Sequence, residues 1–332
     1  MWRPRLTALL VVTAAVTGAV TTTASAVVPD TGTTVEGAGN PFTFALIGDT
    51  PYGDVQRAQF PALVTAINAD PQVRMVLHAG DVKNGKSTCS DERFADLTAL
   101  FNTFKDPFVL TPGDNEWTDC YRTADGSYLP TERLQAVRHY FFRRPGRTGG
   151  DHRMRVRTQA RDREHDAYVE NVLFKRARVV FATVHVVGSN NDLEPWAQLP
   201  GGDRPTERLA EFRARQAAAL DWIDDAFDRA EHVDAAGVLL LMQAEPKAEP
   251  GFAAIRNAIV RRAAAFRRPV LLVHGDEHRY EVERRYAGVP NLTRLETFGN
   301  TATRWLRVTV DRHAPAVFTW TPQTVCRPPQ RC

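Results

Sequence analysis

Cysteine is scarce in this sequence: there are only four, and no two of them have the Cys-x-x-Cys spacing that is typical of structural zinc sites. All four lie beyond an N-terminal segment that indicates export, and an even number of cysteines in an oxidising compartment favours disulfides. Cys89 and Cys120 each follow a predicted strand end by several residues, whereas Cys326 and Cys332 bracket a short loop. We therefore predict two disulfides, Cys89–Cys120 and Cys326–Cys332.

Long apolar runs are absent after the first residues of the chain, so no later segment is long enough to cross a bilayer as a helix. At the start, Arg3 and Arg5 precede an apolar run over residues 6–20, and Ala24-Ser25-Ala26 supplies the small residues of a cleavage site. A membrane anchor is the alternative, but Thr and Gly interrupt this short run. The pattern predicts a signal peptide over residues 1–26, cleaved near Ala26, and a secreted protein without a transmembrane segment.

Charge of either sign is nearly balanced. The formal net charge is +3, and removal of the signal peptide takes away two arginines and leaves +1. This balance gives no indication of a specific reader of nucleic acid. Residues 143–166 are the local exception, since they are rich in Arg, Gly, Asp and His and poor in apolar residues, which predicts an exposed basic insertion. Such a segment can bind phosphates, although most charge runs are solvated surface.

The remaining chain alternates short apolar runs with amphipathic segments, which predicts an α/β layered sandwich with mixed sheets. We expect a flexible leader over residues 27–40, one domain over residues 41–322 and a tail over residues 323–332. Strands are expected at 42–47, 76–79, 108–110, 168–173, 178–187, 238–242, 271–274, 292–298, 304–310 and 316–320. Helices are expected around 60–67 and at 91–104, 131–142, 206–229 and 252–266.

Four of the predicted strands end in the same dipeptide, Gly-Asp. The acids are Asp49, Asp81, Asp114 and Asp276. Open α/β sheets bind ligands at the carboxyl edge, so four such strand ends predict converging carboxylates. Any single Gly-Asp is more often a turn or a helix cap. The recurrence in four strands favours a metal site.

These motifs, in this order, resemble the calcineurin-like metallophosphoesterases, which include the purple acid phosphatases. The resemblance covers residues 42 to about 310 and implies a four-layer α/β/β/α sandwich with a dinuclear metal centre between two mixed sheets. It implies that Asp49 binds the first metal, that Asp81 bridges both, and that His278 is a ligand of the first metal. Asp114 stands where the family usually has a metal-binding Asn.

The sequence departs from the family at several imidazoles. Pro51 replaces the His of the first motif, Asn115 replaces the His that assists the leaving group, Gln243 replaces a metal-binding His, and Asp276 replaces another. The expected metal ligands are Asp49, Asp81, Asp114, Gln243, Asp276 and His278. Since oxygen ligands dominate this set, two divalent ions of the Mn²⁺, Mg²⁺ or Ca²⁺ type are favoured, with Fe or Zn²⁺ as alternatives.

Four further residues are candidates for roles around the metals. Asn115 and His185 are the candidate catalytic residues, although His185 lies on a predicted strand and is as readily interpreted as a buried, hydrogen-bonded histidine. Tyr52 and Asn190 are the candidate substrate-binding residues. Tyr52 follows Asp49 at a spacing reminiscent of the purple phosphatase tyrosine, but it follows a different aspartate from the one in that motif.

The expected function is an exported, metal-dependent phosphoric ester hydrolase acting on a small phosphate monoester or diester. The main alternative is a non-catalytic secreted binding domain of the same fold, which the imidazole losses favour. A third possibility is an α/β domain whose aspartates only cap helices and bind no metal. The metal content of the pure protein, two ions, one or none, distinguishes the three hypotheses.

Overall fold

The computed structural model describes residues 41–325 of the chain. The predicted signal peptide, the leader and the Cys326–Cys332 pair lie outside the described residues. Within the described part, no helix is both long and apolar enough to cross a membrane.

The first sheet has five strands in the order β12-β11-β1-β2-β3. Its strands are β1 (Phe42–Ile47), β2 (Val73–His78), β3 (Phe108–Leu110), β11 (Arg304–Val310) and β12 (Phe318–Thr324). β1, β2 and β3 are parallel, so their carboxyl ends meet at one edge, whereas β11 is antiparallel to both β1 and β12. This register places the chain segments after Ile47, His78 and Leu110 side by side.

The second sheet has seven strands in the order β4-β5-β6-β7-β8-β10-β9. Its strands are β4 (Arg157–Thr158), β5 (Val172–Arg176), β6 (Val179–Thr183), β7 (Gly237–Leu241), β8 (Val270–His274), β9 (Glu281–Arg284) and β10 (Leu292–Glu296). The central strands β6, β7, β8 and β10 are parallel, and antiparallel strands complete both edges. Both sheets are therefore mixed.

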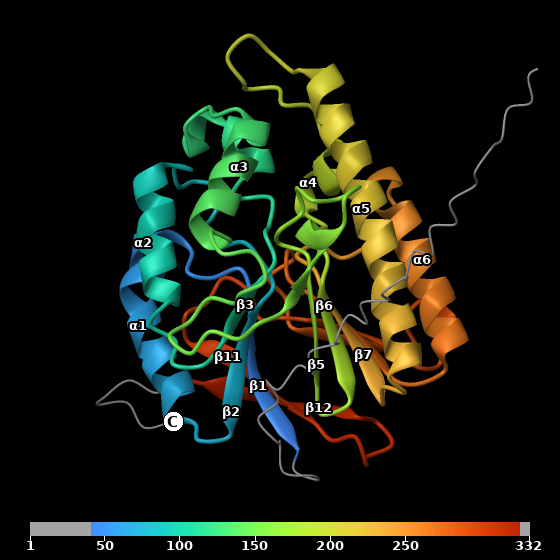
Figure 1. The fold of residues 1–332 in the computed structure, drawn as a ribbon. Coiled ribbons are helices and arrows are strands. Elements are labelled where there is room, and N and C mark those ends of the chain that lie inside the picture. The colour runs from blue at the N-terminus through green and yellow to red at the C-terminus, as the bar shows by residue number, and fades with distance from the viewer. Residues whose placement is uncertain (1–40, 326–332) are drawn as a thin grey trace, which may run out of the picture. The chain divides into compact units, whose positions relative to one another are not determined.

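Helices cover the outer face of each sheet (Figure 1). The longer helices are α1 (Gly53–Ala69), α2 (Asp91–Phe101), α3 (Pro130–Phe141), α5 (Pro205–His232) and α6 (Pro250–Phe266). Apolar residues of α1 and α2 pack with the outward side chains of β1, such as Ala45 and Ile47. α5 and α6 pack in the same way on the second sheet.

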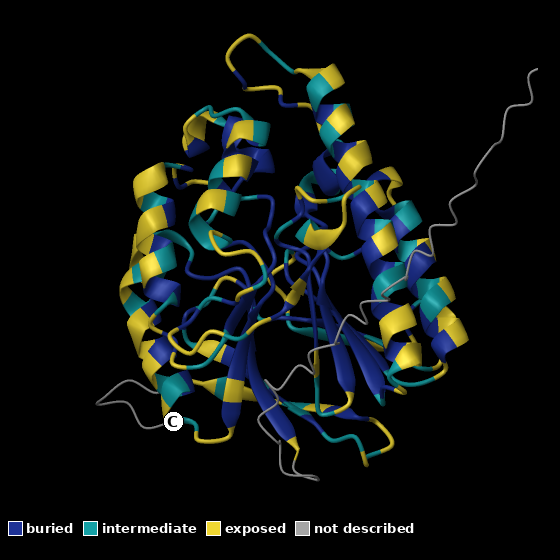
Figure 2. Ribbon diagram, viewed as in Figure 1, coloured by how far each residue is buried: buried dark blue, intermediate teal, exposed yellow. Residues whose placement is uncertain are grey.

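The layer between the two sheets is a third apolar cluster. Phe44 and Leu46 of β1 face Phe181, Leu239 and other side chains of the second sheet. Because strands such as β1 are covered on both faces, they are continuous apolar runs without alternation, and Figure 2 shows these strands as buried. The predicted four-layer α/β/β/α sandwich with two mixed sheets is confirmed.

The strand boundaries differ from the prediction mainly in the β5–β6 hairpin. The first strand starts at Val172 instead of residue 168, because the Thr183 hydroxyl accepts from the Val172 N–H and donates to the Glu170 carbonyl. This side-chain bridge replaces the regular pairing before Val172. β9 (Glu281–Arg284) was not predicted, since an edge strand with partly exposed polar residues has no apolar run.

The segment over residues 143–166 lies mostly at the surface but is anchored to the fold. Gly149 pairs with Phe108 of β3 in an isolated bridge, and Val156 and Gln159 are buried. This segment therefore extends the free edge of the first sheet.

Candidate metal centre

The four Gly-Asp strand ends meet at the carboxyl edges of the two sheets. Ligand atoms of Asp49, Asp81 and His278 lie within 4.8 Å of one another, and so do those of Asp81, Asp114 and Asp276. The two groups therefore share one residue, Asp81. Asp49, Asp81 and Asp114 follow β1, β2 and β3, whereas Asp276 and His278 follow β8 of the other sheet. The carboxylate cluster, defined as these four aspartates, is a candidate site for metal ions.

The backbone turns sharply at most of these positions. Asp49, Asp81, Asp276 and His278 have φ values of 52°, 58°, 82° and 57°, in the left-handed region that residues with side chains rarely adopt. Asp and His tolerate this region better than most residues, but it remains costly. The surrounding fold holds all four residues in this strained conformation, which aims their side chains into one space.

The glycine before each acid allows this close approach. A Cβ atom at position 113 would overlap the carboxylate of Asp81, and one at position 275 would overlap the carboxylate of Asp49. Gly113 and Gly275 thus make room for the aspartate of a neighbouring strand end, whereas Gly80 makes room for the side chain of Gln243 and Gly48 for that of Thr297. Close packing at all four positions is a physical reason for the repeated Gly-Asp pattern.

The close packing of the cluster carboxylates makes a nearby positive charge favourable. Burial raises the pKa of Asp81 well above its ordinary value, and repulsion from Glu116 and Asp49 raises it further. Burial and the neighbouring Asp81 likewise raise the pKa of Asp114, and burial and Asp49 raise that of Asp276 to about 6. Carboxylates forced together in this way are stabilised by cations. Two groups of oxygen-rich ligands that share Asp81 therefore fit the predicted pair of divalent ions.

Glu116 connects two of the site loops from beneath. Its buried carboxylate accepts hydrogen bonds from the backbone N–H groups of Gly113 (2.7 Å) and Val82 (3.3 Å). Burial raises its pKa to about 7, although these backbone donors oppose the rise. Glu116 thus fixes the loop after β3 against the loop after β2.

Gln243 lies among the carboxylates, but its oxygen faces away from them. Its Oε1 accepts from the Gly188 backbone N–H at 2.7 Å, while its Nε2 donates to Asp114 (3.1 Å) and Asp276 (2.9 Å). The predicted role of Gln243 as an oxygen ligand of a metal does not match this orientation. In the structure the side chain is instead a hydrogen-bond donor that joins two carboxylates.

Tyr52 is more central than the sequence suggested. Its hydroxyl donates to Asp81 Oδ2 at 2.6 Å and accepts from Asn115 Nδ2 at 2.9 Å, and His278 Nε2 lies 3.2 Å from it. Asn115 also donates directly to Asp81 Oδ2 at 2.5 Å. Burial and the nearby Asp81 raise the pKa of Tyr52. Two of the predicted residues, one catalytic and one substrate-binding, therefore hold the carboxylate that both ligand groups share.

His278 forms the more open side of the cluster. Its side chain is 34% exposed, and its Nε2 lies 3.5 Å from Asp49 Oδ1. The hydrogen bond to Asp49 raises the pKa of this imidazole.

The other two predicted residues make their contacts elsewhere. His185 is fully buried, with its Nδ1 at 2.8 Å from Glu170 and its ring against Trp117. Burial lowers the pKa of His185. Asn190 accepts from the Gly251 N–H at 2.9 Å and so holds the start of α6. Neither hydrogen bond joins these side chains to the carboxylate cluster, so the structure gives no direct support to a catalytic His185 or a substrate-binding Asn190.

Sequence reasoning missed two hydroxyl groups that contact the cluster. Ser189 donates to Asp114 at 3.3 Å and to the buried Asp119 at 2.7 Å, and Thr297 donates to Asp49 at 3.4 Å. Ser189 directly precedes the candidate Asn190 in the sequence, whereas Thr297 follows β10 without any recognisable motif.

The predicted disulfide between Cys89 and Cys120 is confirmed, with a Cα–Cα distance of 5.9 Å. It joins the segment after β2 to the segment after β3, both of which carry a cluster aspartate. The disulfide therefore braces two site loops from outside the cluster.

Comparisons with known proteins agree with these features. The family model of the calcineurin-like phosphoesterases matches residues 42–280. No curated protein sequence gives a significant match.

Three solved structures are similar at low identity. A purple acid phosphatase, PPD1 from yellow lupin (Lupinus luteus) seeds, is 9% identical, with 86% of this chain and 54% of that chain covered and a TM-score of 0.48. GAP50, the anchor in the inner membrane complex of Plasmodium, is 10% identical, with 86% and 90% covered and a TM-score of 0.45. The calcineurin-like phosphoesterase YfkN from Bacillus subtilis is 12% identical, with 86% and 92% covered and a TM-score of 0.42.

The match therefore spans about half the length of the lupin phosphatase. The family model, by contrast, covers most of the described residues and every aspartate of the cluster. On this match, the chain belongs to the calcineurin-like phosphoesterase family.

Proposed function

We propose that this protein is an exported, metal-dependent phosphoric ester hydrolase with a carboxylate-rich dinuclear centre. The observation that carries the proposal is the sharing of Asp81 by two groups of ligand atoms, each within 4.8 Å. A single carboxylate between two ligand groups is what a pair of neighbouring cations requires. The proposal of export rests on the N-terminal sequence. Mass spectrometry of the secreted protein tests it, since the mature chain should begin at Val27.

In this proposal Asp49, His278 and Asp81 hold one divalent ion, and Asp81, Asp114 and Asp276 hold the other. Two such ions supply an activated water and neutralise the charge that develops on the phosphoryl oxygens. Five of the six ligand positions are carboxylates, which favours Mn²⁺, Mg²⁺ or Ca²⁺, while the imidazole of His278 permits Fe or Zn²⁺.

The neighbouring side chains keep the carboxylates in place. Tyr52 and Asn115 both donate to Oδ2 of Asp81, so its orientation is fixed from the open side of the site. Gln243 links Asp114 and Asp276 from the buried side. These contacts lower the mobility of the ligands, because each carboxylate has a hydrogen-bond partner of its own.

Leaving-group protonation is where this site differs most from the family pattern. The family histidine that assists the leaving group is Asn115 here, and an amide does not release a proton near neutral pH. Esters whose leaving groups depart without full protonation lose least from this change. We therefore propose small aryl phosphate monoesters or diesters as the substrates that are hydrolysed best.

The test combines metal analysis with hydrolysis of 4-nitrophenyl phosphate and bis(4-nitrophenyl) phosphate. The purified protein should contain two divalent ions per chain and should hydrolyse at least one of the two esters. Asp81→Asn should lose at least one ion and nearly all hydrolysis, whereas Asp166→Asn, a change at an exposed aspartate, should lose neither. If Asp81→Asn keeps both ions and full activity, the proposed site is wrong.

One observation favours a second candidate, a non-catalytic binding domain of the same fold. The cluster already receives donors from Gln243, Tyr52 and Asn115, which partly replace the stabilisation that metals give. Such a domain would contain one ion or none and would hydrolyse neither ester with any of the four metals Mn²⁺, Mg²⁺, Zn²⁺ and Fe²⁺. The same measurements therefore separate the two functions.

A further inference from the structure

A second pocket lies beside the first sheet and contains no residue of the carboxylate cluster. Its cavity of about 720 Å³ is bounded by α2, the end of α3, the edge strand β3 and the segment over residues 143–156. The family pattern did not account for this segment, which the sequence marks as basic and the structure anchors to β3 through Gly149. The volume is within the range of small-molecule sites.

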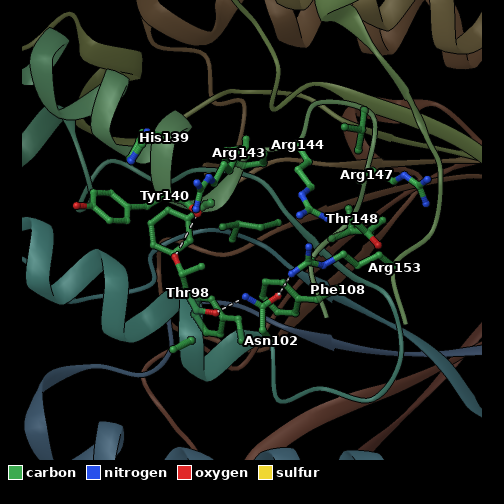
Figure 3. Close-up of a pocket in the computed structure, with 18 of the residues that line it drawn as sticks. Thr98, Asn102, Phe108, His139, Tyr140, Arg143, Arg144, Arg147, Thr148 and Arg153 are labelled. Atoms are coloured by element: carbon green, nitrogen blue, oxygen red, sulfur yellow. Dashed lines mark hydrogen bonds between the residues drawn. The ribbon is translucent and has the colours of Figure 1, made fainter. Parts of the chain in front are cut away.

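The rim of this pocket is positively charged. Arg143, Arg144, Arg147 and Arg153 line it, as Figure 3 shows. Among the described residues, Arg153 donates to neutral oxygens, those of Gly150 (3.3 Å) and Asn102 (3.4 Å). Within residues 41–325, none of these four guanidinium groups forms an ion pair with a carboxylate. The rim arginines are thus not paired with a carboxylate in the part of the chain that the structure describes, although the Asp151 carboxylate lines the adjoining cavity.

The floor of the pocket is apolar and aromatic. Phe101 stacks on Phe108 with ring centroids 4.7 Å apart, and Val109, Leu110 and Val172 complete the surface. All five side chains are buried in the fold. Since these side chains are already buried, the apolar surface that a ligand body can remove from water lies mainly on the partly exposed Tyr140, Phe141 and Phe142, which also line the pocket. Covering that surface favours binding at roughly 25 cal/mol per Å² before the costs of association.

A second cavity of about 660 Å³ adjoins the first on the charged side. Asn102, Arg144, Arg147 and Arg153 line both cavities, and the second has no aromatic floor. The arginines thus stand between an apolar space and an open polar one. A guanidinium binds a phosphate or phosphonate through two parallel hydrogen bonds, so an anionic head fits at this border.

We propose that this pocket binds an amphipathic organic phosphate. The phosphate head lies on Arg144, Arg147 and Arg153, and an alkyl or aryl body lies against the partly exposed Tyr140, Phe141 and Phe142. The binding does not depend on the metal centre, because the two sites share no residue. The ligand is either a free alkyl or aryl phosphate or the exposed headgroup and chain of a phospholipid, since both present the same chemistry.

Octylphosphonate is a suitable probe, because it has the anionic head and the apolar chain but no ester bond to hydrolyse. Isothermal titration calorimetry with the metal-loaded protein should give one site per chain. Inorganic phosphate and octanol, which carry the head and the body alone, should each bind at least about tenfold more weakly. If the protein also co-sediments with phosphatidic acid vesicles, the ligand is a membrane lipid. If it binds octylphosphonate but does not co-sediment, the ligand is a free alkyl or aryl phosphate.

Two variants address the two halves of the pocket. Arg144→Ala/Arg147→Ala should weaken octylphosphonate binding by about tenfold or more, because charge-assisted hydrogen bonds are lost. Arg155→Ala/Arg161→Ala removes the same charge from exposed positions of the same segment that do not line the pocket, and should change binding by less than about twofold. Ala99→Phe, at an exposed position on the wall, should fill part of the apolar space and weaken octylphosphonate more than inorganic phosphate.

Asp81→Asn separates this site from the metal centre. Octylphosphonate binding that persists in Asp81→Asn and falls in Arg144→Ala/Arg147→Ala supports the proposal. Binding that disappears in Asp81→Asn and persists in the double arginine variant places the probe at the metal centre and overturns it. Equal losses in the two double arginine variants, or equal affinity for octylphosphonate and inorganic phosphate, overturn it as well.

Discussion

Asp276→Asn should stabilise the protein when metals are removed and destabilise it when they are present. Asp276 is mostly buried, and burial together with repulsion from Asp49 raises its pKa from 3.8 to about 6. One pKa unit corresponds to about 1.4 kcal/mol. The ionised carboxylate therefore costs the metal-free fold about 3 kcal/mol.

The sign of the pH dependence follows from proton binding. Between pH 4 and pH 6 the native metal-free protein holds the Asp276 proton and the unfolded chain does not, so stability falls as pH rises through this window. Asn at position 276 still accepts the hydrogen bond from Gln243 through its oxygen, and it has no charge to lose. The advantage of the variant should thus be near zero at pH 4 and complete above pH 7.

The assay is thermal unfolding followed by circular dichroism, with chelator-treated protein at pH 4, 6 and 8. For a domain of this size 1 kcal/mol shifts Tm by roughly 2 °C, so Asp276→Asn should unfold about 6 °C above the wild type at pH 8. With Mn²⁺ at 1,000 times its Kd the wild type gains about 4.1 kcal/mol, which exceeds the variant's advantage of about 3 kcal/mol if the variant no longer binds the ion. The order of stability should then reverse.

Asp166→Asn, the exposed control, should show neither the shift nor the reversal. If metal-free Asp276→Asn is less stable than the wild type at pH 8, or if its advantage is the same at pH 4, then Asp276 is not repelled by its neighbours. The carboxylate cluster would then not require cations for its stability.

Three further changes test the surroundings of the cluster. His185→Gln should lower the free energy of unfolding by about 1–3 kcal/mol, because a buried partner of Glu170 is lost, while metal content stays at the wild-type value; loss of metal at unchanged stability would contradict this placement. Replacement of Cys89 and Cys120 by serine removes a disulfide that joins residues with a sequence separation of 31, and should lower the free energy of unfolding by about 4 kcal/mol, measured by urea unfolding. An unchanged urea midpoint would contradict a stabilising role of this disulfide. Gly113→Ala should displace the carboxylate of Asp81 and lower metal affinity by about tenfold or more in a competition titration, and wild-type affinity would show that the loop has room.

The sequence predicted those parts of the molecule that depend on local patterns. Buried strands such as Phe42–Ile47 are continuous apolar runs, and their ends are marked by glycine. Since parallel strands bring their carboxyl ends to one edge, the order of the Gly-Asp motifs was enough to place Asp49, Asp81 and Asp114 together. The short charged strand Glu281–Arg284 escaped prediction because it lacks such a run.

What the sequence could not supply was the direction in which each polar side chain presents its atoms. Gln243 was correctly expected at the cluster, but whether its oxygen or its nitrogen faces the carboxylates depends on the Gly188 N–H, a contact between segments 55 positions apart. The same holds for Tyr52, whose position near Asp81 is created by the turn after β1 and its contact with the loop after β2. Such contacts follow from the packing of loops, for which the sequence carries no periodic signal.

Two of the positions at which imidazoles are missing from this site carry neutral hydrogen-bond donors. The resemblance to the family implies that Gln243 replaces a metal-binding histidine and that Asn115 replaces the histidine that assists the leaving group. In the structure both amides donate to cluster carboxylates, as Tyr52 also does. An amide or a phenol stabilises a carboxylate without a metal, but less than a cation does, because it carries no net charge. The pKa values of Asp81 and Asp114 remain raised despite these donors, so the cluster still favours positive charge. The amide and phenol donors therefore reduce the stabilisation that the cluster gains from a bound metal but do not abolish it. For this reason the metal content of the purified protein, measured before any assay of hydrolysis, decides between an enzyme and a binding domain.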